Sequence, residues 1–311
     1  MKQITRDIIK KNNYLTCANF IVKKHIVTWL LKLVALLPLP IARAIGSGIA
    51  CILSLTNNDI YRLSRINIGL THPQLSNDTL DKITKDSVAS TVINAFEMPI
   101  VWRRDNDWVI KKTVSIEGEE HLTSAINIGK GVIIIAPHIG NWEVLGRQLP
   151  TYSPTTSLYQ PPKLTVLENI VRDGRERSGA KLVPTNTRGV AALLKALKRG
   201  EMTGILPDQV PPKNSGVFSP FYGISAYTMT LVYSLIQKTG CRVVLGSALR
   251  VPGGFKVIYD EAPEGIYNAE QAVSLKALNL MVEMAINNDI AQYQWAYKRF
   301  KVQPEGIEKP Y

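Results

Sequence analysis

Cysteine is scarce in this sequence, and the few cysteines lie far apart. The 311 residues contain three of them, Cys17, Cys51 and Cys241, with no CxxC pair and no cluster of histidine with cysteine. This spacing excludes a disulfide scaffold and a zinc site. It indicates that the chemistry of the protein faces a reducing compartment.

The signature motifs of several enzyme classes are also absent. The sequence contains no GxSxG elbow, no cysteine near a histidine and no HExxH. It contains no GxGxxG and no Walker loop either. Covalent serine catalysis therefore loses support, and nucleotide chemistry has none.

The sequence lacks a long uninterrupted apolar run. Its most apolar stretches, residues 26–37 and 41–55, are separated by prolines, and Lys32 and Arg43 interrupt every window of about 20 residues that a spanning helix needs. We predict two short hydrophobic helices there. Because a basic stretch precedes them, we expect residues 1–55 to attach the chain to a membrane, by spanning it or by lying at its interface. A buried helical hairpin is the alternative, and a cleaved signal peptide fits poorly because the apolar run begins late.

Positive charge is in excess. The chain has 37 lysines and arginines against 25 acids, a formal charge of +12, which favours anionic partners such as phospholipid headgroups, an acidic carrier protein or nucleic acid. With 45% hydrophobic residues the chain can bury a sizeable core. If the basic flank stays inside, the body of the protein is cytoplasmic.

Residues 56–302 are expected to form that body. Residues 56–112 look helical and suit a lid or a membrane-facing subdomain, whereas short β-rich runs alternate with helical stretches from Thr113 onward. This alternation predicts an α/β fold with a mixed central sheet and flanking helices. Residues 303–311 are expected to be a surface tail. We predict strands over residues 113–118, 131–138, 156–159, 202–207, 241–251 and 255–260, and helices over 119–128, from 141, and over 164–177, 189–199, 228–239 and 269–287.

The strand over residues 131–138 is the most informative one. It contains four consecutive β-branched residues, 132–135, a run expected for a strand that is buried on both faces. Ligand sites in such sheets lie at the carboxyl ends of the strands, where His138 falls. Asn141 is a plausible helix N-cap, and Glu143 lies in the first turn of the helix that follows.

His138 and Glu143 can act together because a turn separates them. Glu143 can fold back and accept the ring N–H, which fixes the tautomer and leaves the other ring nitrogen as a general base. This arrangement suits acyl transfer. The alternative is structural, with a histidine at a strand end and a carboxylate that interacts with the helix dipole.

A histidine, four residues and an acid after a β-strand resemble the HX4(D/E) motif of glycerolipid-type acyltransferases. Further blocks occur in order along the chain, namely HIGNWE at 138–143, GRER at 174–177, LPDQ at 206–209, GVFSPFYG at 216–223, YQW at 293–295 and KRF at 298–300. Together they resemble the lipid A biosynthesis acyltransferase family, the late enzymes that add secondary fatty acyl chains to a lipopolysaccharide precursor. The resemblance covers most of the chain.

The resemblance implies an inner-membrane enzyme with its active site on the cytoplasmic side. Such an enzyme moves a fatty acyl group from the thioester of acyl carrier protein to a hydroxyl of a lipid A precursor, without a cofactor or a metal. By this carry-over His138 would be the general base and Glu143 its orienting partner. The residues expected to bind the oxyanion or the substrate are Arg175, Arg177, Asn141, Asp208 and Gln209.

Two alternatives stay open. The same chemistry could act on another acceptor, such as a glycerophospholipid or a glycosylated inositol lipid, or the chain could be a membrane-binding protein without activity. Residues 293–301, YQWAYKRFK, mix aromatic and basic side chains, which suits a membrane interface. No nucleic-acid motif accompanies them, so nucleic acid is not an expected partner.

Overall fold

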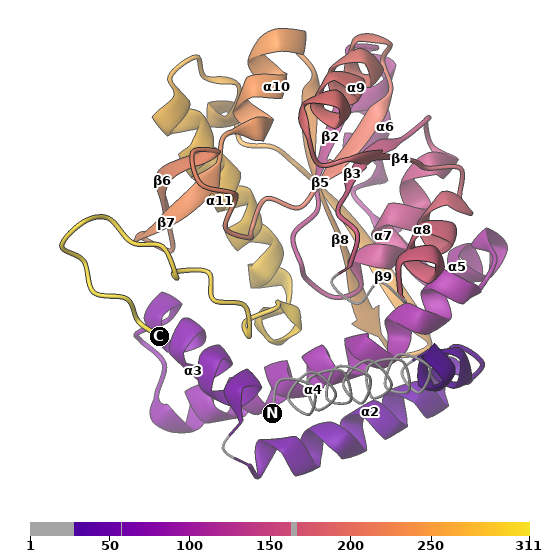
Figure 1. The fold of residues 1–311 in the computed structure, drawn as a ribbon, viewed down its shortest axis with the longest axis vertical. Helices are drawn as coiled ribbons and strands as arrows, with labels where there is room; N and C mark the ends of the chain where they lie inside the picture. Colours follow the sequence, from indigo (N-terminus) through magenta and orange to yellow (C-terminus); the bar gives the residue numbers. More distant parts are fainter. Residues whose placement is uncertain (1–27, 57, 163–166) are drawn as a thin grey trace, which may run out of the picture.

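The computed structural model describes residues 28–56, 58–162 and 167–311. Its nine described strands form a five-stranded sheet in the order β1-β9-β8-β2-β5 and two small two-stranded sheets, β3-β4 and β6-β7 (Figure 1). The strands are β1 (Thr113–Glu117), β2 (Val132–Ile135), β3 (Thr156–Tyr159), β4 (Lys181–Pro184), β5 (Met202–Ile205), β6 (Gly216–Phe221), β7 (Ile224–Met229), β8 (Arg242–Val251) and β9 (Gly254–Glu261).

Helices surround the sheet, and a short helix over residues 28–34 precedes the labelled ones. The predicted α/β class with a mixed central sheet is confirmed, since β8 and β9 pair antiparallel while β2 pairs parallel with both β5 and β8. The helices are α2 (Leu39–Ser54), α3 (Asp59–Thr71), α4 (Asn77–Arg103), α5 (Asn106–Lys112), α6 (Glu119–Asn127), α7 (Trp142–Gln148), α8 (Glu168–Glu176), α9 (Thr187–Lys198), α10 (Leu231–Thr239) and α11 (Gln271–Asn288), with 3-10 turns η1 (Leu149–Thr151), η3 (Glu264–Tyr267) and η4 (Ile290–Gln292).

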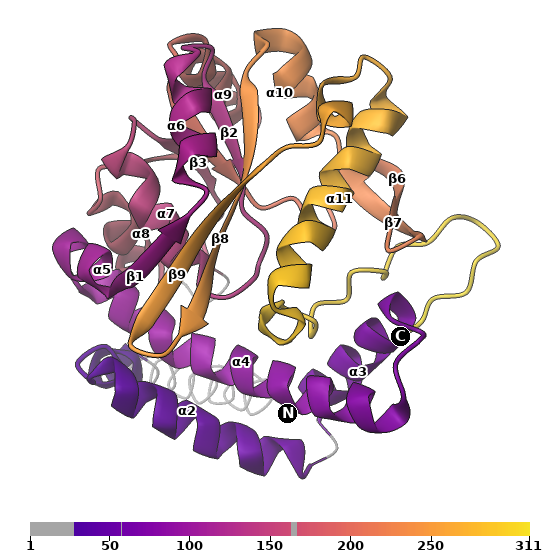
Figure 2. The same cartoon turned by 180° about the vertical axis from the view of Figure 1, so that it is seen from behind.

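Strand β2 lies inside the sheet and is buried on both faces, as its β-branched run predicts. Val132 and Ile134 pack into one apolar cluster with α5, α6 and α7, and Ile133 and Ile135 pack into a second cluster with α9, α10 and α11. Figure 2 shows the second group of helices from behind. Burial of each such side chain contributes about 1.5–3 kcal/mol, so the position of β2 is firmly held.

The element predictions hold with a few exceptions. The expected helix over residues 228–239 is wrong at its start, because Thr228 belongs to β7 and α10 begins only at Leu231. The strands β6 and β7 were not expected. They form a hairpin because Tyr222 and Gly223 both adopt positive φ angles, 49° and 76°, as a tight two-residue hairpin turn requires. Strand β4 was not expected either, and part of the predicted helix 164–177 lies outside the described residues.

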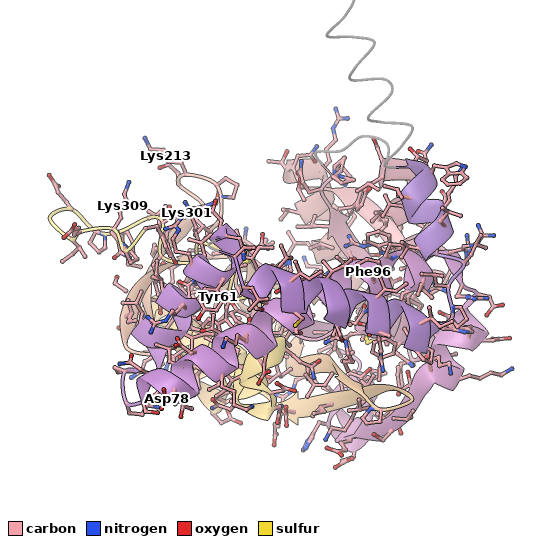
Figure 3. All side chains as sticks on the ribbon, turned by 90° about the horizontal axis from the view of Figure 1, so that it is seen from below. Tyr61, Asp78, Phe96, Lys213, Lys301 and Lys309 are labelled. Carbon is pink, nitrogen blue, oxygen red and sulfur yellow. The ribbon has the colours of Figure 1, made fainter. Side chains whose placement is uncertain are left out.

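The amino-terminal helices form a layer across one end of the sheet (Figures 1 and 2). Figure 3 looks onto this layer and labels Tyr61 and Phe96, which pack around a small apolar cluster shared by α2 and α4. Helix α2 approaches α4 closely, since a Cβ atom on Gly46 would lie only 3.0 Å from the Ile93 Cα atom. The two short hydrophobic helices are confirmed within the described residues, and the basic flank lies outside them.

One bent helix pair among the described residues has the combined length and composition of a membrane span. Among the described residues, no single helix is both long and apolar enough to cross a bilayer. Helices α2 and α3 reach that length and composition only when they are taken together, and they meet at an angle of 82°.

The carboxyl-terminal residues 303–311 contain neither helix nor strand. The expected surface tail is nevertheless anchored at its end. The Tyr311 hydroxyl accepts a hydrogen bond from the Phe300 N–H at 3.2 Å and donates one to Asn67 of α3. The last residue therefore ties the tail to the helical layer.

Candidate active site

The turn after β2 carries His138, and neighbouring segments hold it rigidly. Gly140 donates its N–H to the Gln292 carbonyl at 3.0 Å, and Asn141 donates its N–H to the Ala248 carbonyl at 2.8 Å. Gly140 has a φ of +55°, and a Cβ atom there would lie 2.1 Å from the Ala248 carbonyl oxygen. Only glycine fits this turn, so Gly140 fixes the path of the chain between His138 and helix α7.

Asp208 is the partner of the histidine ring. The His138 Nδ1 atom lies 2.8 Å from Asp208 Oδ1, and the His138 backbone N–H donates to Asp208 Oδ2 at 3.0 Å. The prediction that Glu143 accepts the ring N–H is therefore wrong. The reason is the parallel pairing of β2 with β5, which brings the carboxyl ends of both strands, and hence His138 and Asp208, to the same edge of the sheet.

The second ring nitrogen of His138 is the one available for chemistry. With Nδ1–H donated to Asp208, Nε2 keeps its lone pair, and the Gln209 amide nitrogen lies 3.3 Å from it as a donor. The histidine ring also packs edge-on against Trp142 at 4.8 Å between ring centroids. Gln209 thus lies on the side of the ring opposite to Asp208, next to Nε2.

Glu143 pairs with Arg175 instead. The Arg175 guanidinium donates two parallel hydrogen bonds to the Glu143 carboxylate, at 2.9 and 2.6 Å. Burial opposes ionisation of this carboxyl, but the charge and the hydrogen bonds of Arg175 and weaker contributions from neighbouring side chains together lower the pKa of Glu143. The pair joins α7 to α8 and places Arg175 against the helix that follows His138.

Asp208 is also ionised. Its side chain is 2% exposed, and although burial raises its pKa, the electrostatic interaction with the His138 ring and the hydrogen bonds from His138 together lower that pKa below its ordinary value. Burial and the nearby charge of Asp208 raise the pKa of Tyr293 well above its usual value, which keeps that phenol neutral. The site therefore presents a carboxylate on one side of His138 and a neutral amide on the other.

Two other predicted site residues serve the surrounding structure. Asn141 caps α7 by accepting the Val144 N–H at 3.3 Å, as expected of an N-cap, and its amide donates to Glu97 at 3.3 Å. Arg177 is exposed and donates to the Arg103 carbonyl at the end of α4. The structure thus brings together His138, Asp208 and Gln209, places Glu143 and Arg175 beside them, and leaves Arg177 at the periphery.

A buried carboxylate on α4 was missed by the sequence analysis. Glu97 is fully buried and binds Arg43 of α2 at 2.7 Å and Arg250 of β8 at 2.9 Å, in addition to Asn141. It ties the helical layer to the sheet and to the cap of α7. A lone acid within the apolar stretch AFEMPIVW was the only available signal.

Residues 293–301 are only partly exposed, with Lys298 and Lys301 at the surface. Tyr293, Trp295, Arg299 and Phe300 are all buried, and the Arg299 guanidinium donates to the Tyr227 carbonyl at 2.7 Å. The interpretation of this segment as a membrane interface is therefore wrong for these four residues. The segment also supports the turn that carries His138, since Gln294 donates its N–H to the His138 carbonyl at 3.0 Å.

An apolar cavity lies beside the Glu143–Arg175 pair. It extends between α7, β5 and the β3-β4 sheet, and its wall combines the two charged side chains with apolar ones. The apolar members include Trp142, Leu145, Leu149, Leu158, Leu182 and Leu206. Such a wall suits a hydrocarbon chain whose reactive end faces the polar residues.

A histidine that has one ring nitrogen held by a buried aspartate and the other facing an amide, next to an apolar cavity, is an arrangement suited to a group-transfer enzyme. The chain matches the model of the bacterial lipid A biosynthesis acyltransferase family over residues 9–302, and it belongs to this family. The protein is an acyltransferase. The family resemblance noted in the sequence is thereby confirmed.

Curated relatives cover nearly the whole chain. It is 25% identical over 300 residues to the lipid A biosynthesis palmitoleoyltransferase of Escherichia coli (strain K12). The matched region covers 94% of this chain and 96% of the relative. It is 25% identical over 297 residues to the lipid A biosynthesis lauroyltransferase of the same organism, with 93% and 95% covered. A lipid A biosynthesis acyltransferase of Haemophilus influenzae is likewise 25% identical, with 92% and 94% covered.

Proposed function

We propose that the protein transfers a fatty acyl chain from the thioester of acyl carrier protein to a hydroxyl of a lipid A precursor, as a secondary acylation in lipopolysaccharide biosynthesis. The observation that carries this proposal is the arrangement of His138, whose Nδ1 is held by Asp208 while Nε2 faces an amide donor. Family membership and the apolar cavity beside it supply the substrate class.

The reaction needs one base and no covalent enzyme intermediate. His138 Nε2 takes the proton from the acceptor hydroxyl, and the oxygen attacks the thioester carbonyl carbon to form a tetrahedral oxyanion. As this intermediate collapses, the carbon–sulfur bond breaks and the thiolate of the carrier takes the proton back from His138. Asp208 stabilises the imidazolium while it exists and keeps the ring in one tautomer.

Arg175 supports the oxyanion in this mechanism. Two of its guanidinium nitrogens bind Glu143, and the third, Nη1, makes no hydrogen bond within the part of the chain that the structure describes. The side chain is one third exposed and lines the apolar cavity, so Nη1 can reach a carbonyl oxygen at the mouth of that cavity. Glu143 then acts by holding Arg175, a role other than the orientation of His138 expected from the sequence.

The donor is expected to dock on positive charge. Acyl carrier protein is acidic, and this chain carries a formal charge of +12. Near the cavity, Arg172 lies in the middle of α8 and Arg177 follows its last residue, where it donates to the Arg103 carbonyl at the end of α4. This cationic rim suits a carrier that delivers its acyl chain into the cavity.

The amino-terminal helices are expected to attach the protein to the inner membrane on its cytoplasmic side. Helix α2 is apolar on two faces. Its inner face, with Ala42, Gly46 and Ala50, packs on α4, whereas a second stripe at helical spacing is exposed. The exposed stripe consists of Ile41, Ile45, Ile49 and Ile52, and the preceding helix adds Trp29, Leu30, Leu33 and Leu36. An exposed apolar surface of this kind is typical of membrane contact.

The proposed reaction is tested by mass spectrometry of the lipid products. Purified protein is mixed with acyl carrier protein that carries a fatty acid and with an underacylated lipid A precursor, beside a His138→Ala control. We expect a gain of one acyl mass with the intact enzyme alone. Transfer only to a glycerophospholipid or a glycosylated inositol lipid would show that the acceptor is not a lipid A precursor. A covalent acyl adduct on a serine or cysteine would contradict direct transfer.

Membrane attachment is tested by flotation with vesicles of anionic phospholipid. The double variant Ile45→Glu/Ile49→Glu should lose most of the vesicle-bound fraction, because it places two charges in the exposed stripe. Leu280→Glu is the matched control, since Leu280 is an exposed leucine on α11, away from the helical layer. Equal binding of both variants would show that α2 does not contact lipid.

A further inference from the structure

A second cavity of about 210 Å³ adjoins the catalytic histidine on the side of α4. It lies between α4, Trp142 and the segment 292–294. That segment is joined to the catalytic turn, because Gln294 donates its N–H to the His138 carbonyl and accepts a hydrogen bond from the Gln209 amide. The cavity therefore opens beside the same amide group that faces His138 Nε2.

Trp142 lines this cavity and also the apolar cavity beside Glu143. Its ring packs edge-on against the ring of His138. Trp142 thus lies between two cavities and against the ring of His138, so each cavity comes within one side chain of the catalytic base. In a reaction with two substrates, each substrate can then approach the base from its own side.

The chemistry of the second cavity differs from that of the first. Its polar members carry only hydroxyl and amide groups, and none of the described residues that line it is charged. They are Ser90, Thr91 and Asn94 of α4 with Gln292 and Gln294. Uncharged donors and acceptors of this kind match the hydroxyls and amides of a glycolipid, whereas a phosphate group would call for arginine or lysine.

Asn94 lacks a partner that its burial requires. The residue is 7% exposed, and its Oδ1 atom is buried without a hydrogen bond from any described residue. A buried amide oxygen left unpaired costs free energy, and one that lines a cavity next to an active site can be satisfied by a ligand. A hydroxyl or an amide N–H of the acceptor would supply the missing donor.

We propose that this cavity is the acceptor subsite, where Asn94 and its neighbours bind the uncharged hydroxyl and amide groups around the reacting hydroxyl of the glycolipid. The inference rests on the proposed function and adds to it the place and the chemistry of acceptor recognition. The acyl chain of the donor enters the cavity beside Glu143, on the other side of Trp142.

Two variants test the subsite through steady-state kinetics. Asn94→Leu keeps the size of the side chain but removes its hydrogen-bonding groups, and we expect the KM for the lipid A precursor to rise about tenfold. Ala95→Trp fills the mouth of the cavity from an exposed position of α4, so it should raise the same KM without disturbing the fold. The KM for the acylated carrier should stay unchanged in both.

Ser87→Ala is the matched control. Ser87 is a buried residue of α4 whose hydroxyl also lacks a partner among the described residues, but it does not line the cavity. We expect wild-type kinetics for this variant. The assignment of this cavity as the acceptor subsite is wrong if the wild-type enzyme transfers acyl groups and both variants keep the wild-type KM for the acceptor. It is also wrong if the variants raise the KM for the carrier instead. If wild-type enzyme does not transfer at all, the proposed function itself fails.

Discussion

Two buried carboxylates lie at the carboxyl end of the sheet, Glu143 in the helix after β2 and Asp208 after β5. Asp208 holds a histidine, which gains and loses a proton in the proposed mechanism, whereas Glu143 holds an arginine, which stays charged. The pKa of both acids is lowered by these partners against the effect of burial. The comparison shows that the acid nearest to His138 in sequence is not the acid that orients it.

The largest expected effect comes from Asp208→Asn. An asparagine amide can donate to His138 Nδ1 and so favour the tautomer whose Nε2 already carries a proton, which removes the base. We expect kcat to fall by about 10³- to 10⁴-fold. Initial rates of acyl transfer measure this effect, and Asp173→Asn, at an exposed position of α8, should keep the wild-type rate. A loss of less than about tenfold would remove Asp208 from the mechanism.

Glu143→Gln should act in a different way. It leaves the Arg175 guanidinium without its ionic partner in a largely buried place, and we expect a loss of about 1–3 kcal/mol in the free energy of unfolding. The rate should fall as well, while the pH dependence of the remaining activity stays as in the wild type, because His138 keeps Asp208. Urea denaturation measures the free energy of unfolding. The control is Glu176→Gln, at an exposed position of α8 next to Arg175.

The pH dependence of stability sharpens the same comparison. Since the pKa of Glu143 is lower in the folded protein than its ordinary value of 4.5, the pair with Arg175 contributes its full stability above that value and loses it as the pH falls through the folded pKa. Thermal unfolding between about pH 6 and about pH 3 should therefore show a steeper loss for wild type than for Glu143→Gln. Parallel curves would mean that folding does not lower the pKa of Glu143.

The smallest effect is expected for the cap of α7. Asn141→Ala removes the N-cap of α7, and Asn186→Ala removes the N-cap of α9. Each substitution should lower the free energy of unfolding by about 1 kcal/mol. Asn141 also binds Glu97 and lies in the catalytic turn, so only Asn141→Ala should lower kcat. Equal activity of the two variants would show that the cap does not position His138.

The local elements were largely predictable from the sequence. Four consecutive β-branched residues form β2, and the turn at Gly140 with its Asn141 cap follows from residue types within a few positions. The hairpin β6-β7 was missed, because its turn places Tyr222, which is not a glycine, at a positive φ. Short apolar helices at the amino terminus were expected from the proline breaks, and they occur as such in the described residues.

By itself the sequence determined the α/β class, the position of His138 at a strand end and the family blocks, because each of these depends on residues that are close along the chain. Only the tertiary structure decided that Asp208 binds His138 and that Glu143 binds Arg175. These contacts join residues 70 and 32 positions apart. They depend on the parallel register of Ile135 with Ile205 and on the packing of α8 beside α7, which no local pattern specifies. Hydrogen-bond partners are selected by distances of a few ångströms, and only the packed chain sets those distances.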